Sequence, residues 1–223
     1  MTITWSHTML KNFENCPRKG YHMHIAKDLP KPDSEAMRWG NSVHKALEQR
    51  IGKGFDLPSE MGQYEPMALA VLDKAQHIAK DIRITTEEKL GVTTTGKGTG
   101  FFDKDVWGRG AIDVLMVKEP VALIVDWKTG KRREDPQELE VFGLLLQASR
   151  PAIRNIYGVY VWLQDETIGP LHNLSATGET WLSINRQMQG IETMQKDNKF
   201  PPTPNPLCGW CPVKACEHNR SKE

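Results

Sequence analysis

The chain has 223 residues and an almost balanced charge, with 29 Lys and Arg against 28 Asp and Glu and a formal net charge of +1. Its 39% hydrophobic and 26% charged residues are typical of a soluble globular protein and exclude a disordered or collagen-like chain. No apolar run approaches the roughly 20 residues of a membrane helix, and the first residues lack the basic flank and apolar core of a signal peptide. We therefore expect a cytoplasmic protein with no membrane partner.

The first third of the sequence predicts helices. Thr8 is expected to cap a helix over residues 9–15, and Ser34 a second one over 35–51. Apolar residues at helical spacing predict a third helix over 66–82, so that 35–82 forms a helical region. The two apolar stripes comprise Met37, Gly40, Val43, Leu47 and Ile51, and then Leu69, Leu72, Ala75, Ile78 and Ala79. His44 lies beside the first stripe, where a histidine is more often a core residue than a metal ligand.

The middle of the chain then predicts a sheet core over residues 84–163. Strands are expected at 84–92, 106–117, 121–128 and 156–163, with a Gly- and Thr-rich loop at 93–100. Asp135-Pro-Gln-Glu138 has the form of a capping box and predicts a helix ending near Ser149. A last helix over 179–197 is expected to bury Trp181, Ile184, Met188, Ile191 and Met194. This order predicts an α/β (α+β) fold with a mixed central sheet flanked by helices.

Two carboxylates and a lysine are expected to meet on one hairpin. If the strands at 106–117 and 121–128 pair across a tight turn at Glu119-Pro120, Asp113 stands opposite Asp126 with Cβ atoms roughly 4.5–5.5 Å apart. Lys128, two residues on, shares that face. Facing carboxylates suit a bridging Mg²⁺ or Mn²⁺ ion, whereas a solvated sheet face is the plain alternative. The apolar run before Asp126 predicts a strand buried on both sides and favours the metal site.

A short basic segment follows this hairpin. Lys131, Arg132 and Arg133 either hold a phosphate backbone beside the metal or form an ordinary solvated loop.

The four cysteines stand at the two ends of the chain. Cys16 is near one end, and Cys208, Cys211 and Cys216 are near the other. In a reducing compartment, clustered thiols indicate metal ligation rather than disulfides. The Pro-rich residues 200–206 predict an extended strap that returns the C-terminal cysteines to Cys16. A tetrahedral zinc and an iron–sulfur cluster both accept four thiolates, so the spacing leaves both open.

Five motifs then follow one another along almost the whole chain. They are Cys16-Pro17, Gly40-Asn-Ser-Val-His44, Gly110-Ala-Ile-Asp113, Asp126-Trp-Lys128 and the three C-terminal cysteines. In this order the chain resembles the RecB-type branch of the PD-(D/E)xK nuclease superfamily. It is most similar there to the small iron–sulfur exonucleases of CRISPR systems and phages, and to the cluster-bearing nuclease domain of bacterial recombination helicase–nucleases. The resemblance implies a single restriction-endonuclease-like domain over 1–223, with cluster-binding ends at 1–30 and 200–223.

The resemblance also implies a role for each matching residue. His44, Asp113 and Asp126, with the Trp127 backbone carbonyl, would hold Mg²⁺ or Mn²⁺, and Lys128 would orient the attacking water. The four cysteines would ligate a structural [4Fe-4S] cluster, which favours iron over zinc. The implied partners are DNA, single-stranded or with single-stranded ends, and proteins of recombination, replication or CRISPR adaptation.

Some positions depart from the pattern. Glu138 and Phe142 stand where the family has Gln and Tyr, and Glu138 is attributed to the capping box rather than to the site. Glu87 and Glu88 either supply a further acidic residue or line a solvated strand. The expected function is a metal-dependent DNA exonuclease. The alternatives are a catalytically silent DNA-binding module and a zinc-stabilised protein of other chemistry.

Overall fold

The computed structural model describes residues 3–30, 33–133 and 135–221. The chain forms two compact units, one made of residues 1–32 with 178–223 and the other of residues 33–177. Each unit is described by itself. In the part of the chain that the structure describes, no helix has the length and apolar character needed to span a membrane.

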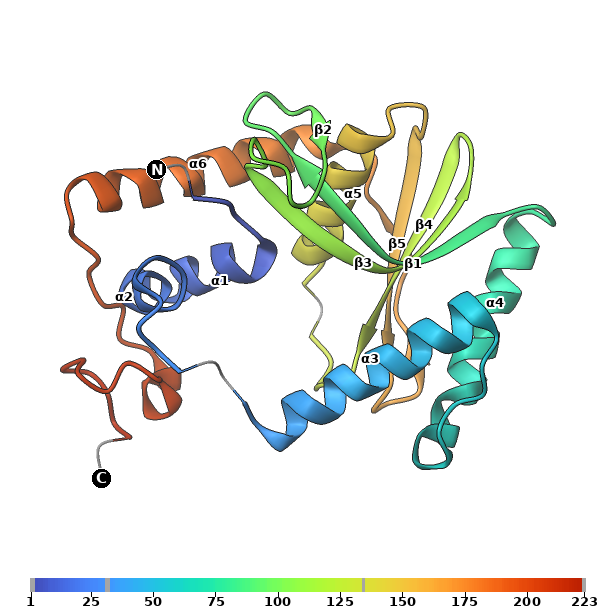
Figure 1. Cartoon of the computed structure of the whole chain (residues 1–223), viewed down its shortest axis with the longest axis horizontal. Helices are drawn as coiled ribbons and strands as arrows, with labels where there is room; N and C mark the ends of the chain where they lie inside the picture. The colour runs from blue at the N-terminus through green and yellow to red at the C-terminus, as the bar shows by residue number, and fades with distance from the viewer. Residues whose placement is uncertain (1–2, 31–32, 134, 222–223) are drawn as a thin grey trace. The chain divides into compact units, whose positions relative to one another are not determined.

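The larger unit is built on a mixed sheet (Figure 1). Its described residues form seven strands in the order β2-β1-β3-β4-β5-β6, with β7 also paired to β5. Only the neighbours β4 and β5 run parallel in this described sheet, and α5 connects them. The strands are β1 (Arg83–Val92), β2 (Gly98–Thr99), β3 (Gly108–Lys118), β4 (Val121–Lys128), β5 (Asn155–Trp162), β6 (Thr167–Ile168) and β7 (His172–Asn173). The predicted α/β class is confirmed.

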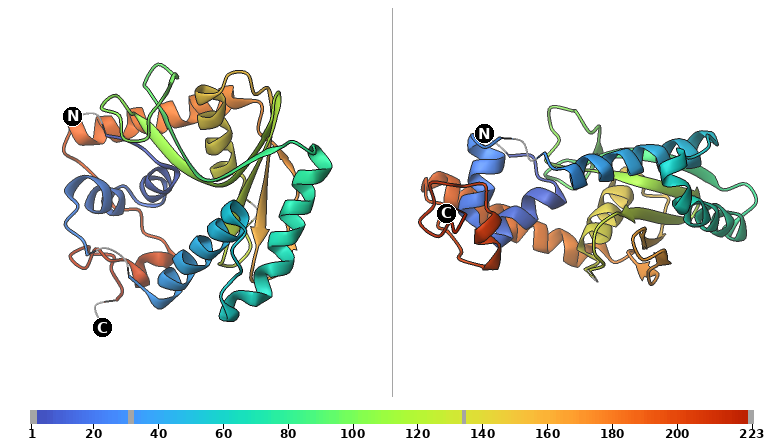
Figure 2. Two further views of the ribbon diagram at one scale, coloured as in Figure 1. Left: turned by 45° about the vertical axis from the view of Figure 1, so that its right-hand side comes forward. Right: turned by 90° about the horizontal axis from the view of Figure 1, so that it is seen from below.

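Helices cover both faces of this sheet. On one face lie α3 (Glu35–Lys53) and α4 (Glu65–Ile78), joined by the 3₁₀ helix η2 (Ser59–Tyr64). Val43 and Leu47 of α3 share a buried core with side chains of β3, β4 and β5. On the opposite face lies α5 (Gln137–Ser149), as the right view of Figure 2 shows. Burial on both faces explains why residues 122–127 of β4 are all buried.

The β3–β4 hairpin has the predicted register. Lys118 pairs with Val121 across the two-residue turn Glu119-Pro120, and the ladder continues to the pair Val114 and Val125. The ladder ends there, one pair short of Asp113 and Asp126, which the same register places opposite each other. At this end, the Trp127 N–H donates a 2.9 Å hydrogen bond to Asp113 Oδ2 instead. Regular backbone pairing between β3 and β4 therefore ends at the two acidic residues.

Two helix predictions need correction. The first helix, α1, runs over His7–Asn15 and is capped by Ser6, whose Oγ accepts a hydrogen bond from the Met9 N–H, so the expected Thr8 cap is wrong. In α4 the expected Ala75 is buried together with Ala68 and Val71, whereas Leu72 is only half-buried and Leu69 and Ile78 are exposed. Smaller residues let this helix approach its neighbours closely, and Leu69 faces outward. The Ser34 cap of α3 is confirmed by the hydrogen bond from the Met37 N–H.

The smaller unit is helical and combines both ends of the chain. It contains α1, α2 (Pro17–Gly20), the π-helical turn η1 (Tyr21–Ala26), α6 (Thr177–Lys196, from residue 178 on) and the 3₁₀ helix η3 (Pro206–Trp210). Residues 200–205 have no regular structure, as their prolines predict. Helix α6 buries Ile184, Met188 and Ile191, but Trp181 and Met194 are only half-buried. The expected stripe is therefore confirmed in its centre and wrong at its two ends.

Candidate active site

His44 and Asp113 meet at the open end of the β3–β4 hairpin. His44 Nδ1 from α3 lies 3.3 Å from Asp113 Oδ1, and the other oxygen of Asp113 accepts the hydrogen bond from Trp127. Helix α3 can come this close because it carries Gly40 one turn earlier, where a Cβ would stand 3.1 Å from the Thr129 hydroxyl. The Gly-x-x-x-His motif thus has a packing role as well as a chemical one.

Asp126 and Lys128 form a second pair with Glu138 of α5. The Lys128 ammonium lies 2.6 Å from Asp126 Oδ2 and 2.6 Å from Glu138 Oε2. Asp126 is only 4% exposed. Although its Oδ2 contacts the ammonium, no donor among the described residues reaches this buried oxygen with good hydrogen-bond geometry. Burying a charged carboxylate costs folding free energy unless a cation lies beside it.

Burial and charge shift the acid–base behaviour of these groups. Burial, together with the charges of Asp113 and Glu138, raises the pKa of Asp126 to about 7 despite the opposing effect of Lys128. Burial alone would lower the pKa of Lys128, but Asp126 and Glu138 outweigh it and raise that pKa. Burial likewise lowers the pKa of His44, while the hydrogen bond and charge of Asp113 raise it above its ordinary value. The site therefore holds its protons more tightly than isolated side chains do.

Glu138 is the residue that sequence reasoning missed. The expected capping box does not form: the Gln137 N–H donates to Asp135 Oδ1, whereas Glu138 turns to Lys128. Tyr160 of β5 was also not expected here, and its ring centroid lies 5.2 Å from Lys128 Nζ. The signal that could have found Glu138 is its position in the first turn of α5, directly after the strand that carries Lys128.

Glu87 lies near the same site. The pairs Thr86 with Val114 and Glu88 with Ile112 place Glu87 across from Asp113, and its backbone is left-handed with φ of 53°. Burial and the charge of Asp113 raise the pKa of its carboxyl. Glu88 instead forms an ion pair with Arg150. Of the two glutamates left open by the sequence, Glu87 is the one that faces the site.

The basic segment lies beyond the end of β4. Lys131, Arg132 and Arg133 are exposed and have no regular secondary structure. Their expected contact with phosphate stays a prediction.

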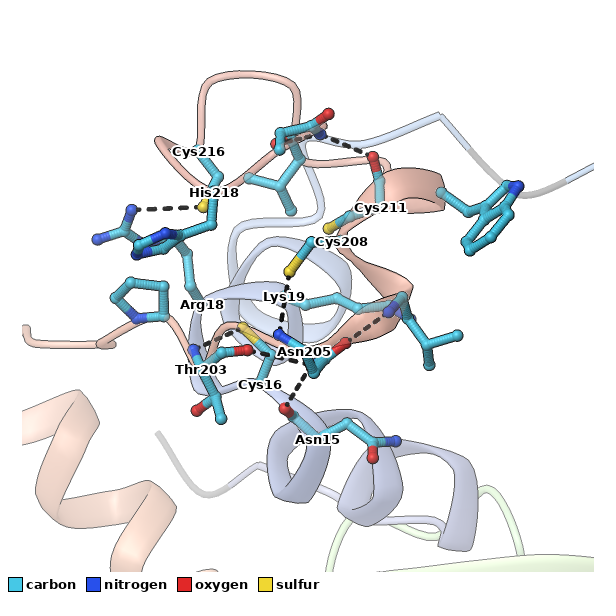
Figure 3. A pocket seen from close by; sticks show the side chains of 15 residues that line it. Asn15, Cys16, Arg18, Lys19, Thr203, Asn205, Cys208, Cys211, Cys216 and His218 are labelled. Atoms are coloured by element: carbon cyan, nitrogen blue, oxygen red, sulfur yellow. Dashed lines mark hydrogen bonds between the residues drawn. The ribbon is translucent and has the colours of Figure 1, made fainter. Parts of the chain in front are cut away.

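The four cysteines line one pocket of the smaller unit. Cys16, Cys208, Cys211 and Cys216 surround a cavity of about 170 Å³ (Figure 3). None of them forms a disulfide. Cys16 comes from the junction of α1 and α2, and the other three from η3 and the residues after it. The expected meeting of the two chain ends is therefore present.

Three of these sulfur atoms accept N–H donors. The Thr203 N–H donates to Cys16 Sγ at 3.4 Å, and the Asn205 N–H donates to Cys208 Sγ at 3.4 Å. Arg18 donates to Cys216 Sγ at 3.7 Å and forms an ion pair with Glu217 (Figure 3). Hydrogen bonds to cysteine sulfur are also a usual feature of metal–thiolate sites.

Neither group of side chains stands in the geometry of a coordination shell. Within residues 3–30, 33–133 and 135–221, no three His, Cys, Asp or Glu side chains form a group that could hold a metal ion. The donors are engaged in the hydrogen bonds and ion pairs above, so metal binding would require them to exchange these partners.

Comparisons with known proteins identify the family. The sequence profile of the PD-(D/E)XK nuclease superfamily matches residues 4–216. The crystal structure of a candidate exonuclease from Eubacterium rectale resembles this chain with a TM-score of 0.60 and 15% identity, over 98% of this chain and 89% of that one. The crystal structure of SSO0001 has a TM-score of 0.45 and 14% identity, over 98% and 88% of the two chains.

These comparisons differ in what they establish. At 15% identity the first likeness concerns the fold, and the second is too distant to carry an argument. No curated protein matches the sequence. The profile, in contrast, spans nearly all of the chain and includes His44, the β3–β4 hairpin and all four cysteines. The chain therefore belongs to the PD-(D/E)XK nuclease superfamily.

Proposed function

We propose that the protein is a metal-dependent deoxyribonuclease, an exonuclease that hydrolyses phosphodiester bonds of DNA with single-stranded ends, and that a structural [4Fe-4S] cluster joins its two chain ends. The observation that carries the nuclease proposal is the convergence of Asp113, Asp126 and Lys128 with His44 at the open end of one hairpin. Membership of a nuclease superfamily whose members usually use divalent metals supports it.

The donor set fits a hard divalent cation. His44, Asp113, Asp126 and the Trp127 carbonyl would hold Mg²⁺ or Mn²⁺, whose preferred ligands are oxygen atoms and, for Mn²⁺, also imidazole. The buried Oδ2 of Asp126 lacks a well-directed donor and has the Lys128 ammonium beside it, so a metal ion could take over its charge balance. A bound ion of this kind lowers the pKa of its water and stabilises charge on the phosphoryl group.

Lys128 is held as a cation rather than as a base. Two carboxylates at 2.6 Å keep it protonated at neutral pH, so it donates hydrogen bonds and carries positive charge. In the proposed reaction it orients the attacking water and attracts the scissile phosphate. If Asp126 bound a metal ion instead of Lys128, Glu138 would remain as the partner that positions Lys128.

A cleavage assay tests the nuclease proposal. End-labelled single- and double-stranded DNA is incubated with the protein and Mg²⁺ or Mn²⁺, and the products are followed in time. Asp126→Ala and Lys128→Ala should each abolish cleavage while circular dichroism shows an intact fold. Full activity in either variant would refute the assigned roles. Binding of DNA without any cleavage by the wild-type protein would assign the DNA-binding module instead.

The cluster proposal has support of its own. All four cysteines of the chain line one pocket, which also contains N–H donors to three of the sulfur atoms. Four thiolates match the ligands of a [4Fe-4S] cluster, and N–H···S hydrogen bonds are among the features that set its potential. Zinc would accept the same donors, so the test must measure the metal itself.

Anaerobic purification provides that test. Iron and acid-labile sulfide in about equal amounts, together with the visible absorbance of a cluster, are the expected result. Cys211→Ser should lower the metal content and the stability together, because metal binding couples to folding. A colourless protein that contains zinc would refute the cluster, as would a Cys211→Ser protein that stays folded with its full content of iron.

A further inference from the structure

An exposed pair of aromatic rings follows β2, away from the metal-binding residues. Phe102 is 77% exposed, and its ring meets that of Phe101 edge to face with centroids 4.8 Å apart. A phenylalanine exposed to this degree gains nothing from the protein core and costs solubility. A single exposed ring is in itself ordinary on a protein surface, so its neighbours decide what it can bind.

The loop that carries these rings is firmly held. Asp103 Oδ2 accepts a hydrogen bond from the Gly100 N–H, and the single proton of the Thr99 hydroxyl is shared between Asp103 Oδ2 and Asp105 Oδ1. At its base, a Cβ on Gly98 would stand 2.5 Å from Ser149 Cα, so this strand lies directly against the end of α5. A rigid loop presents Phe102 without the entropy cost of ordering it upon binding.

Two cations stand over the rings. Arg109 lies 4.8 Å from the centroid of Phe101, and Lys89 lies 5.8 Å from that of Phe102. Gly91 pairs with Arg109 and Lys89 with Ala111, so the two cations are diagonal neighbours on β1 and β3. The nearby carboxylates of Asp103 and Asp105 accept hydrogen bonds within the loop. Aromatic faces beside positive charges are the features that bind single-stranded nucleic acid.

Arg109 lies on the face of the sheet from which His44 reaches Asp113. A Cβ on Gly110 would lie 3.0 Å from side chains of α5, so Gly110 faces α5. Strand alternation therefore turns Arg109 and Ala111 to the opposite face, the one that α3 covers and from which His44 contacts Asp113. Arg109 is four residues from Asp113, a distance of roughly 14 Å along the strand. At about 3.4 Å per nucleotide in a fully stacked strand, and more in an extended one, this spans at most about four nucleotides.

We propose that Phe102 is a stacking platform for a base of single-stranded DNA within about four nucleotides of the cleaved bond, with Lys89 and Arg109 binding the neighbouring phosphates. This inference rests on the proposed function, because it takes DNA as the substrate. It adds a binding subsite that holds the strand while its end lies at the metal-binding residues. Duplex DNA, whose bases are already paired and stacked, does not use this platform.

The test measures DNA affinity in a protein that does not cut. Fluorescein-labelled dT12 and a blunt duplex are titrated with the Lys128→Ala chain in the presence of Mn²⁺, with and without Phe102→Ala. The expected result is a Kd for dT12 raised about 5- to 150-fold and a Kd for the duplex changed less than about twofold. Phe102→Trp should retain tight binding and Phe102→Leu should not.

Phe55 offers a matched control. It is 56% exposed and Lys53 lies 6.0 Å from its ring, so Phe55→Ala removes an exposed ring beside a lysine elsewhere on the unit. This variant should bind dT12 as the parent does. As a readout of position, 5-iodouracil is placed in turn at each of about four nucleotides next to the cleaved end, and one of these positions should photocrosslink to Phe102 or Phe101, identified by mass spectrometry.

The two proposals fail in different ways. If the parent chain binds dT12 and the wild-type protein cleaves it, but Phe102→Ala changes nothing, the platform is wrong and the nuclease stands. An equal loss for single-stranded and duplex DNA would also overturn stacking. If the wild-type protein neither binds nor cleaves DNA, the proposed function itself fails.

Discussion

Replacing Asp126 by Asn should abolish cleavage and yet stabilise the metal-free protein at high pH. Burial raises the pKa of Asp126 to about 7 in the folded protein, whereas an aspartate in an unfolded chain has a pKa of about 3.9. The folded state therefore binds this proton more tightly, and stability is lost as pH rises from about 4 through about 7. Asparagine resembles the neutral acid and carries no such loss. Lys128 keeps Glu138 as a partner in the variant.

The size of the effect follows from the same shift. Each pH unit between the two pKa values costs the folded protein about 1.4 kcal/mol, so the wild type should lose roughly 2–3 kcal/mol relative to Asp126→Asn between pH 5 and pH 7. Lys128 is protonated in both states over this range and adds no slope. His44, whose pKa is also raised, is present in both proteins.

Urea unfolding followed by circular dichroism measures this difference. Both proteins are unfolded at pH 5, 6, 7 and 8 in buffers freed of divalent metals, under anaerobic conditions. Asp165→Asn, which changes an exposed carboxylate, is the matched control and should follow the wild type at every pH. The reasoning is refuted if the advantage of Asp126→Asn is the same at pH 5 and pH 8, or if this variant is the less stable protein at pH 8.

Three further outcomes are expected. Glu138→Ala should slow single-turnover cleavage about 10- to 100-fold because Lys128 loses one of its two partners. Glu138→Gln, which still offers an oxygen to the ammonium, should slow cleavage less, and equal rates for the two variants and the wild type would contradict this role. Metal-dependent cleavage should increase as pH rises through about 7, because the imidazole and the buried carboxylate with raised pKa must lose protons before binding metal, and a pH–rate profile that falls there would disagree. Gly98→Ala should cost about 1–3 kcal/mol in thermal unfolding since its Cβ would meet the Ser149 backbone, whereas Gly190→Ala, in an open helical position, should be neutral or slightly stabilising.

Short-range spacing explains which parts of the site could be predicted. The two-residue turn between β3 and β4 sets the register of the hairpin, and that register alone places Asp113 near Asp126. Lys128 follows from strand alternation. These relations depend on residues close together in sequence, so they survive any uncertainty about the rest of the fold.

The missed features depend on competition between partners. The Glu138 carboxylate could accept hydrogen bonds either from the N-terminus of its own helix or from a lysine on the neighbouring strand. Only the position of α5 over the sheet decides between these two partners. The face of α4 was wrong for a related reason, because both the leucines and the smaller residues repeat at helical spacing. The Phe102 platform left no periodic signal at all, since exposure of an aromatic ring in a loop follows from the path of that loop.

The cysteine pocket combines residues that lie far apart in sequence, so its four cysteines are synthesised at different times. Cys16 precedes Cys208 by 192 residues, so at about 5–20 residues per second the first thiol waits roughly 10–40 seconds for the others during synthesis. The whole of residues 33–177 leaves the ribosome in that interval and can fold as the larger unit. A cofactor held by all four thiols can consequently bind only after Cys216 has been synthesised, and an unprotected Cys16 is open to oxidation until then.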